Sequence, residues 1–210
     1  VDPVMVAATG TPLMHKDALE ALIKLLSYTE LVTPNMREAE KLAGFKITSK
    51  ADMRRAAKAI SKLGPRAVLV KGGHLKGRDV VDVLYSNERF KEFKSPRVIS
   101  QPTHGTGCSF ASAITAELAK GAGLHEAISN AKEFIECAIE SRLRVGKGVM
   151  PVNQMAALFL SAEKGRTLEE VWRAAQLLAE DSDFVKLLPE VGSNIAMALP
   201  GGEKTSDVVG

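Results

Sequence analysis

The stretch RAVLVKGG, residues 66–73, decides the fold of this chain. Four apolar residues, two of them β-branched, run without interruption into a lysine and a pair of glycines. A short continuous apolar run of this kind is typical of a strand that is buried on both faces of a parallel sheet. Glycines directly after a strand let the backbone turn or approach a ligand closely. The stretch therefore predicts a central strand whose carboxyl end presents Lys71 and Gly73.

The segments around this strand alternate between extended and helical patterns. Extended patterns cover residues 1–7, 29–34 and 97–100, and residues 79–86 and 89–95 form a predicted hairpin that turns at Asn87-Glu88. Helical patterns cover residues 16–27, 50–63 with Ser49 as the N-cap, and 110–144 with a break at residues 121–123. Alternation of strands and helices, with glycines at strand ends, predicts an α/β fold with a mostly parallel central sheet.

The composition excludes several classes of protein. The chain has 210 residues, of which 45% are hydrophobic and 25% charged, and its net charge is +3. This charge is too small to indicate binding to nucleic acid or to a membrane surface. No apolar run approaches the roughly 20 residues of a membrane span, and no signal peptide is recognisable. The two cysteines, Cys108 and Cys137, favour a reducing, cytoplasmic setting over a disulfide framework.

A second glycine-rich stretch, HGTGCSF at residues 104–110, lies where a loop turns into a helix. Backbone N–H groups of Gly105, Thr106 and Gly107 at a helix amino terminus predict an anion site. Cys108 follows at once, and the field of the helix is expected to lower its thiol pKa. Two cysteines with one nearby histidine cannot build a four-ligand zinc site, which leaves a core residue or an acid/base. We predict an acid/base role beside a bound phosphate.

Further polar residues follow the other predicted strands, at the edge where open α/β sheets bind ligands. Asp2 lies near the start of the chain, and Asn35 and Glu38 open a helix three residues apart. An amide and a carboxylate on one helix face can hold a hydrated magnesium ion. Each feature also has a simpler interpretation: Asp2 as a turn cap, Asn35 and Glu38 as a helix start, and Lys71 as a surface charge.

Five segments in order resemble one family. They are DPVMVA, VTPNMREAEKLAG, VLVKGGH, QPTHGTGCSFASAI and GKGVMPVN, within residues 2–153. Together they resemble the hydroxymethylpyrimidine/phosphomethylpyrimidine kinases of thiamine biosynthesis, in the ribokinase-like superfamily. The resemblance implies a three-layer sandwich with a mostly parallel central sheet, from which the amino-terminal strands of the family are missing here. It also implies that ATP and Mg²⁺ are used and that the partner is a small-molecule pyrimidine.

The resemblance assigns roles to the candidate residues. Cys108 stands at the catalytic position, where most ribokinase-like enzymes have aspartate, and would be the base for the substrate hydroxymethyl group. Gly105, Thr106 and Gly107 would form the anion hole.

The same resemblance assigns the remaining candidates to the nucleotide, the metal and the substrate. Asp2, Asn35 and Glu38 would organise magnesium and the nucleotide phosphates, with Asp2 and Glu38 as the metal ligands. Lys71 and Gly73 would lie at the ATP phosphates, and Val4 would line the pyrimidine pocket.

The end of the chain has its own resemblance. FVKLLPEVGSNIAMALPGGEKTSDVVG, residues 184–210, is similar to the start of the ThiN-type thiamine-phosphate synthase domain. We expect residues 1–155 to be the carboxy-terminal part of a kinase domain, 156–165 a linker, and 166–210 the start of the synthase domain. The parent would be bifunctional and truncated at both ends here. A pyridoxal-type kinase and a non-catalytic ligand sensor stay open as alternatives, and the superfamily often forms homodimers.

Overall fold

The chain forms two compact units, Val1–Gln154 and Met155–Gly210. The computed structural model describes residues 1–6, 11–98, 103–142, 146–187, 194–200, 202 and 205–209. Each unit has its own architecture, and the candidate site residues named above all lie in the first unit.

The first unit is built on a four-stranded sheet in the order β1-β2-β3-β4. The strands are β1 (Leu31–Val32), β2 (Ala67–Val70), β3 (Asp79–Ser86) and β4 (Arg89–Pro96). β1 and β2 are parallel, whereas β2–β3 and β3–β4 are antiparallel. The α/β class is confirmed, but among the described residues this sheet is mixed rather than mostly parallel. The reason is that a short loop joins β2 to β3, and parallel strands need a longer crossover.

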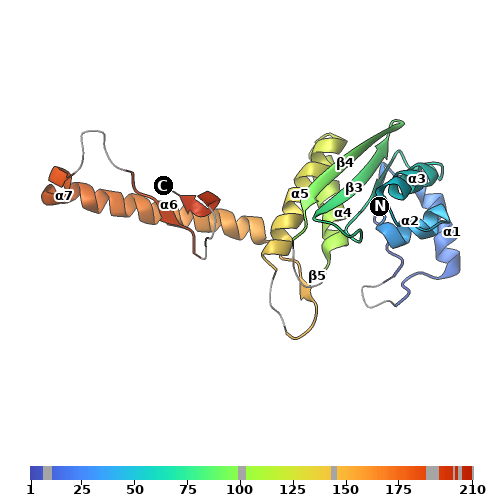
Figure 1. The fold of residues 1–210 in the computed structure, drawn as a ribbon, viewed down its shortest axis with the longest axis horizontal. Coiled ribbons are helices and arrows are strands. Elements are labelled where there is room, and N and C mark those ends of the chain that lie inside the picture. The colour runs from blue at the N-terminus through green and yellow to red at the C-terminus, as the bar shows by residue number, and fades with distance from the viewer. Residues whose placement is uncertain are drawn as a thin grey trace. The chain divides into compact units, whose positions relative to one another are not determined.

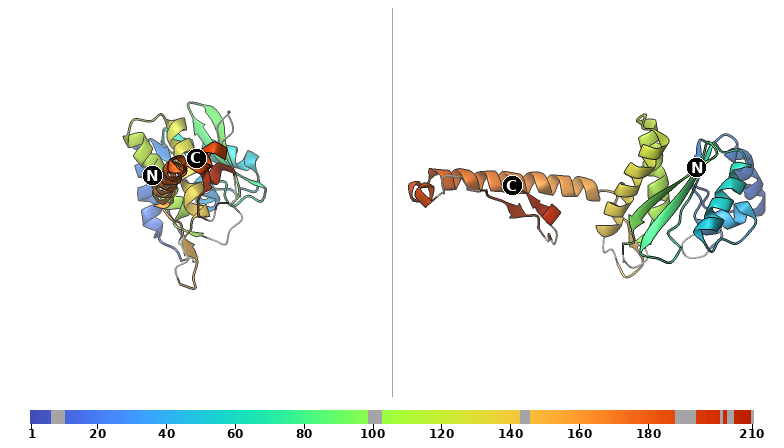
Figure 2. Two further views of the ribbon diagram at one scale, coloured as in Figure 1. Left: turned by 90° about the vertical axis from the view of Figure 1, so that its left-hand side faces the viewer. Right: turned by 45° about the horizontal axis from the view of Figure 1, so that its top comes forward.

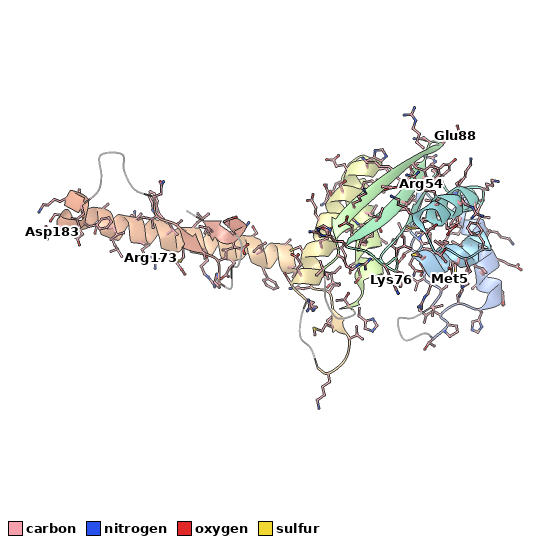
Figure 3. All side chains as sticks on the ribbon, viewed as in Figure 1. Met5, Arg54, Lys76, Glu88, Arg173 and Asp183 are labelled. Atoms are coloured by element: carbon pink, nitrogen blue, oxygen red, sulfur yellow. The ribbon has the colours of Figure 1, made fainter. Side chains whose placement is uncertain are left out.

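The predicted hairpin is confirmed with its turn. Asn87 and Glu88 both have positive φ, 48° and 60°, and join β3 to β4. Such a two-residue turn has the twist that antiparallel strands require. Glu88 marks its tip in Figure 3. A second parallel pair joins β5 (Thr103–His104) to β6 (Met150–Pro151).

Helices cover the four-stranded sheet on both faces, as Figures 1 and 2 show. One face carries α1 (Lys16–Leu26), α2 (Met36–Ala43) and α3 (Lys50–Ser61), and the other carries α4 (Thr106–Ala119) and α5 (Leu124–Glu140). Successive residues of β2 alternate between two apolar cores: Val68 and Val70 pack toward the first face, Ala67 and Leu69 toward the second. The expected three-layer arrangement is therefore present in this unit.

Two short strands expected from the sequence are not found among the described residues. Residues 1–6 form no strand, although Val1 bonds to the backbone of β1 and its flank and Val6 forms an isolated bridge with Pro12. Arg97 and Val98 are not in a strand, and the rest of the segment 97–100 lies outside the described residues. The helix break near Gly121–Gly123 and the N-cap at Ser49, whose side chain accepts from the N–H of Asp52, agree with expectation.

The second unit consists of α6 (Ala156–Glu180), α7 (Ser182–Leu187), a 3₁₀ turn (Thr205–Asp207) and the antiparallel pair β7 (Met197–Ala198) and β8 (Val208–Val209). The expected linker, residues 156–165, forms the first turns of α6. In the sequence, Thr167 and Glu170 have the residue types and spacing of a capping box and predict a helix start there. This prediction is wrong, because Thr167 lies inside α6 and is only 3% exposed. Among the described helices, none combines the length and apolarity that a membrane crossing requires.

Candidate active site

The loop before α4 has the geometry of an anion-binding helix start. Gly105 is the N-cap, with φ of 85°, and no side chain caps the helix. The first N–H groups of α4 are thus not taken by a capping side chain. A Cβ on Gly107 would lie 3.2 Å from Nζ of Lys71 and 4.0 Å from Oδ2 of Asp2. The backbone of this loop therefore passes directly beside a lysine–aspartate pair.

This pair joins the first residues of the chain, beside β1, to the residue that follows β2. Nζ of Lys71 lies 2.8 Å from Oδ1 of Asp2, and both side chains are 13% exposed. Asp2 reaches this position because Val1 pairs with β1: its amino group donates to the carbonyl of Leu31, and its carbonyl accepts from the N–H of Thr33. Lys71 follows β2 directly. Two residues predicted separately from the sequence thus meet at one sheet edge.

Cys108 lies in the first turn of α4 with an exposed side chain, beside the Asp2–Lys71 pair. Partial burial raises the pKa of this thiol, the neighbouring Asp2 carboxylate raises it further, and Lys71 opposes both effects. The expectation of a lowered thiol pKa is therefore wrong. Burial and a nearby negative charge both favour the protonated form of a thiol.

Asn35 and Glu38 form a capping box at the start of α2. The side chain of Asn35 accepts from the N–H of Glu38 at 3.0 Å, and Oε2 of Glu38 accepts from the N–H of Asn35 at 2.8 Å. The contacts of Asn35 are therefore those of a helix N-cap, as the simpler interpretation of the sequence predicts. Glu38 is only 5% exposed. Burial raises its pKa, backbone N–H groups and Lys71 oppose the rise, and Asp2 adds to it.

The glycines after β2 differ in their surroundings. A Cβ on Gly72 would lie 1.9 Å from the carbonyl oxygen of Val81, whereas a Cβ on Gly73 would meet nothing within 4 Å. The sequence singles out Gly73, but packing requires the glycine at 72. The carbonyl of Gly73 accepts from Arg97, which also donates to the carbonyls of Leu75 and Gly77. The sequence gives no signal for this role of Arg97.

Two cavities meet at the Asp2–Lys71 pair. The first, of about 590 Å³, is lined by Lys71, Gly73, Thr106 and Gly107 together with apolar side chains that include Val80, Val98, Ile135 and Ile139. The second, of about 840 Å³, is lined by Asp2, Val4 and Cys108 among others. Both volumes suit small-molecule ligands. Because Lys71 lines one cavity and Asp2 the other, a group passed between two ligands would cross at this pair.

The carboxylate oxygens near the Asp2–Lys71 pair suit a cation that keeps part of its water shell better than a metal ion coordinated by protein side chains alone. In the described part of the chain, no three His, Cys, Asp or Glu side chains are grouped so that they could hold a metal ion. Asp2 and Glu38 supply carboxylate oxygens, the ligand type of Mg²⁺, which keeps several waters and is completed by substrate phosphates. The donor set therefore fits a Mg²⁺ ion that arrives with a nucleotide.

Comparison with known proteins agrees with this geometry. The family model for phosphomethylpyrimidine kinase matches residues 1–153, and the model for thiamine-phosphate synthase ThiN matches residues 170–210. The chain is 48% identical to the thiamine biosynthesis bifunctional protein ThiED of Geobacter sulfurreducens, over 75% of this chain and 32% of that protein. It is 43% identical to the hydroxymethylpyrimidine/phosphomethylpyrimidine kinase of Haemophilus influenzae, over 74% of this chain and 60% of that one.

A solved structure extends the likeness to three dimensions. The pyridoxal kinase of Staphylococcus aureus in complex with AMP-PCP and pyridoxal superposes with a TM-score of 0.68 at 36% identity. The match covers 75% of this chain and 57% of that kinase. The chain thus spans 32% to 60% of the length of these relatives. By the match over residues 1–153, the chain belongs to the phosphomethylpyrimidine kinase family.

Proposed function

We propose that the complete protein transfers the γ-phosphoryl group of ATP to the hydroxymethyl group of 4-amino-5-hydroxymethyl-2-methylpyrimidine, and then phosphorylates the resulting monophosphate, in thiamine biosynthesis. The observation that carries this proposal is the Asp2–Lys71 pair between two cavities, with Gly107 and Cys108 beside it. The names of the relatives, ThiED and hydroxymethylpyrimidine/phosphomethylpyrimidine kinase, support the choice of substrate.

The nucleotide would occupy the cavity of about 590 Å³. Its apolar lining suits a base, and Lys71 with the uncapped N–H groups of Gly105, Thr106 and Gly107 suits the phosphates. Gly73 would leave backbone free beside them. Mg²⁺ would be held by Asp2 and Glu38, with Asn35 fixing Glu38 through the capping box, and would neutralise phosphate charge.

The acceptor would occupy the second cavity, against Val4 and Cys108. As its hydroxyl oxygen bonds to the γ-phosphorus, the bond to ADP breaks and the hydroxyl proton must leave. We assign this proton to Cys108: its thiolate takes the hydroxyl proton and becomes a thiol, and the nearby charge of Lys71 favours the thiolate form before transfer. Phosphoryl transfer needs only such a modest base, since positioning and charge neutralisation dominate.

Residues 166–210 would be the start of a thiamine-phosphate synthase domain, which the ThiN match over residues 170–210 supports. The complete protein would then phosphorylate the pyrimidine and couple it to the thiazole phosphate. A pyridoxal kinase is the second candidate, because the pyridoxal kinase of Staphylococcus aureus shares both fold and sequence with this chain.

The test is a comparison of initial rates for the complete protein with hydroxymethylpyrimidine and with pyridoxal, each at saturating ATP and Mg²⁺. We expect the specificity constant for the pyrimidine to exceed that for pyridoxal by at least about tenfold, a preference of about 1.4 kcal/mol in the transition state. Higher efficiency with pyridoxal would favour the second candidate. Absence of phosphorylation with both would contradict the proposed function.

A further inference from the structure

A second lysine–carboxylate pair lines the nucleotide-sized cavity, away from the Asp2–Lys71 pair. Nζ of Lys132, on α5, lies 2.6 Å from Oδ2 of Asp82, on β3, and their side chains are 9% and 5% exposed. Both residues line the same cavity as Lys71. They are far apart in sequence, so the pair ties a helix to the centre of the sheet.

Asp82 has a second contact that links the pair to the candidate site. Its Oδ1 accepts from the N–H of Gly72 at 2.8 Å, inside the protein. Gly72 follows Lys71, whose own N–H donates to the carbonyl of Pro34. The packing of Gly72 against Val81 leaves no room for a side chain, so the peptide is confined on that side as well.

This arrangement is a weak way to stabilise a fold. Removing two charges from water costs much of what their attraction returns, and well-packed apolar pairs often stabilise as well or better. A positional role explains the contacts better, because one carboxylate fixes both the ammonium of Lys132 and the amide of Gly72. Movement of that amide would displace Lys71 on one side and Gly73 on the other.

We infer that Asp82 is a positioning residue for the nucleotide, acting through the N–H of Gly72, and that Lys132 holds the Asp82 carboxylate in place. The inference rests on the proposed function, since it assigns ATP to the cavity of about 590 Å³. It gives the two side chains no contact with the reacting atoms. Their effect is on where Lys71 and Gly73 lie when the phosphates arrive.

Two matched double variants of the complete protein separate position from charge. Asp82→Asn/Lys132→Met removes both charges but keeps a side-chain oxygen that can accept from Gly72. Asp82→Leu/Lys132→Met removes the charges and the acceptor. We expect the first to keep the KM for ATP within about threefold of wild type and the second to raise it roughly tenfold, since small displacements of positioning groups can cost up to about 100-fold. The KM for the pyrimidine should stay unchanged in both.

Two outcomes would overturn the inference. A KM for ATP near the wild-type value in both double variants would show that the pair does not position the nucleotide, and an equally raised KM in both would indicate direct contact by Lys132. Calorimetric titration with a non-hydrolysable ATP analogue, and hydrogen exchange at the Gly72 amide, read the same effect without turnover. Because neither measurement depends on phosphorylation of the pyrimidine, both can contradict the inference about Asp82 independently of the proposed function. Asp82→Ala/Lys132→Met, with the same expectation, replaces the leucine variant if that variant does not fold.

Discussion

Two lysine–carboxylate pairs lie at the cavity of about 590 Å³ but differ in their surroundings. In the Asp2–Lys71 pair both side chains are 13% exposed, and the thiol of Cys108 lies beside the pair. In the Asp82–Lys132 pair the side chains are 9% and 5% exposed, for lysine and aspartate respectively, and the carboxylate also accepts from the backbone of Gly72. The same two functional groups thus lie beside a chemically active thiol in one case and fix a peptide in the other.

This difference teaches that the neighbour of each pair, rather than the ion pair itself, distinguishes the two sites. A thiol can take up or release a proton, whereas a backbone amide can only be held. The first pair should therefore affect turnover, and the second the placement of the nucleotide. Breaking the second pair should also lower stability, because it leaves a buried charge without its partner.

The largest expected effect is on turnover at the first pair. Lys71→Met should lower kcat by about 10³-fold, because it removes a cation that would stabilise charge on the transferred phosphoryl group. Initial rates at saturating ATP and pyrimidine measure this loss. Lys76→Met is the matched control, since Lys76 is exposed in the same loop and is labelled in Figure 3. Turnover of the Lys71 variant within threefold of the control would remove the contrast between the two pairs.

The second pair should respond in stability. Asp82→Ala should lower the free energy of unfolding by about 3–5 kcal/mol, because it leaves Lys132 buried without its partner and Gly72 without its acceptor. Denaturant titration followed by circular dichroism gives this value. Asp79→Ala, at an exposed position of the same strand, is the control. A loss as small as that of the control would mean that the pair does not fix this part of the fold.

The glycines beside the two pairs provide a smaller and more local contrast. Gly72→Ala should cost about 3 kcal/mol of stability, because its Cβ would overlap the carbonyl of Val81 and the main chain must shift. Gly73→Ala should cost less than about 1 kcal/mol at an open position. Thermal unfolding of the two variants side by side measures both. Equal destabilisation would show that conformational freedom, rather than packing, requires these glycines.

The smallest effect concerns pH. Burial raises the pKa of Glu38, so the folded state binds a proton more tightly than the unfolded state there. The contribution of Glu38 to stability is complete below its unfolded pKa and declines as pH rises through the raised value. Glu38→Gln, which can still accept from Asn35, should therefore gain stability relative to wild type as pH rises through this window. Denaturation series at several pH values test it, and a difference that shrinks with rising pH would contradict the sign.

Local patterns in the sequence predicted much of the fold. The continuous apolar run within residues 66–73 and the turn at Asn87-Glu88 depend on neighbouring residues alone, and the structure contains both the strand and the turn. The mixed sheet was not predicted, because pairing of β3 with β2 depends on the path of the chain between them. The helix start expected at Thr167 failed because α6 begins earlier, at Ala156.

The candidate site was predicted only in part. Lys71 and Cys108 stand out because each follows a strand or a glycine-rich loop, and Asp2 stands out in the first segment of the family resemblance. Nothing local shows that the thiol is partly buried beside the Asp2 carboxylate, so the predicted lowering of the thiol pKa was wrong. Asp82, Lys132 and Arg97 were missed for a related reason. Their roles come from contacts between residues distant in sequence, and one polar residue in a strand or a helix has no distinctive pattern.

The central claim is that Cys108 handles the proton at the crossing between the two cavities, and one pair of variants tests it most directly. Cys108→Ala in the complete protein should lower kcat for pyrimidine phosphorylation by about 10²–10⁴-fold, the usual contribution of a general acid/base, while ATP affinity stays unchanged. Cys137→Ala, which removes the only other cysteine, on α5, should leave kcat near wild type. Turnover of the Cys108 variant equal to that of the Cys137 variant would contradict the account.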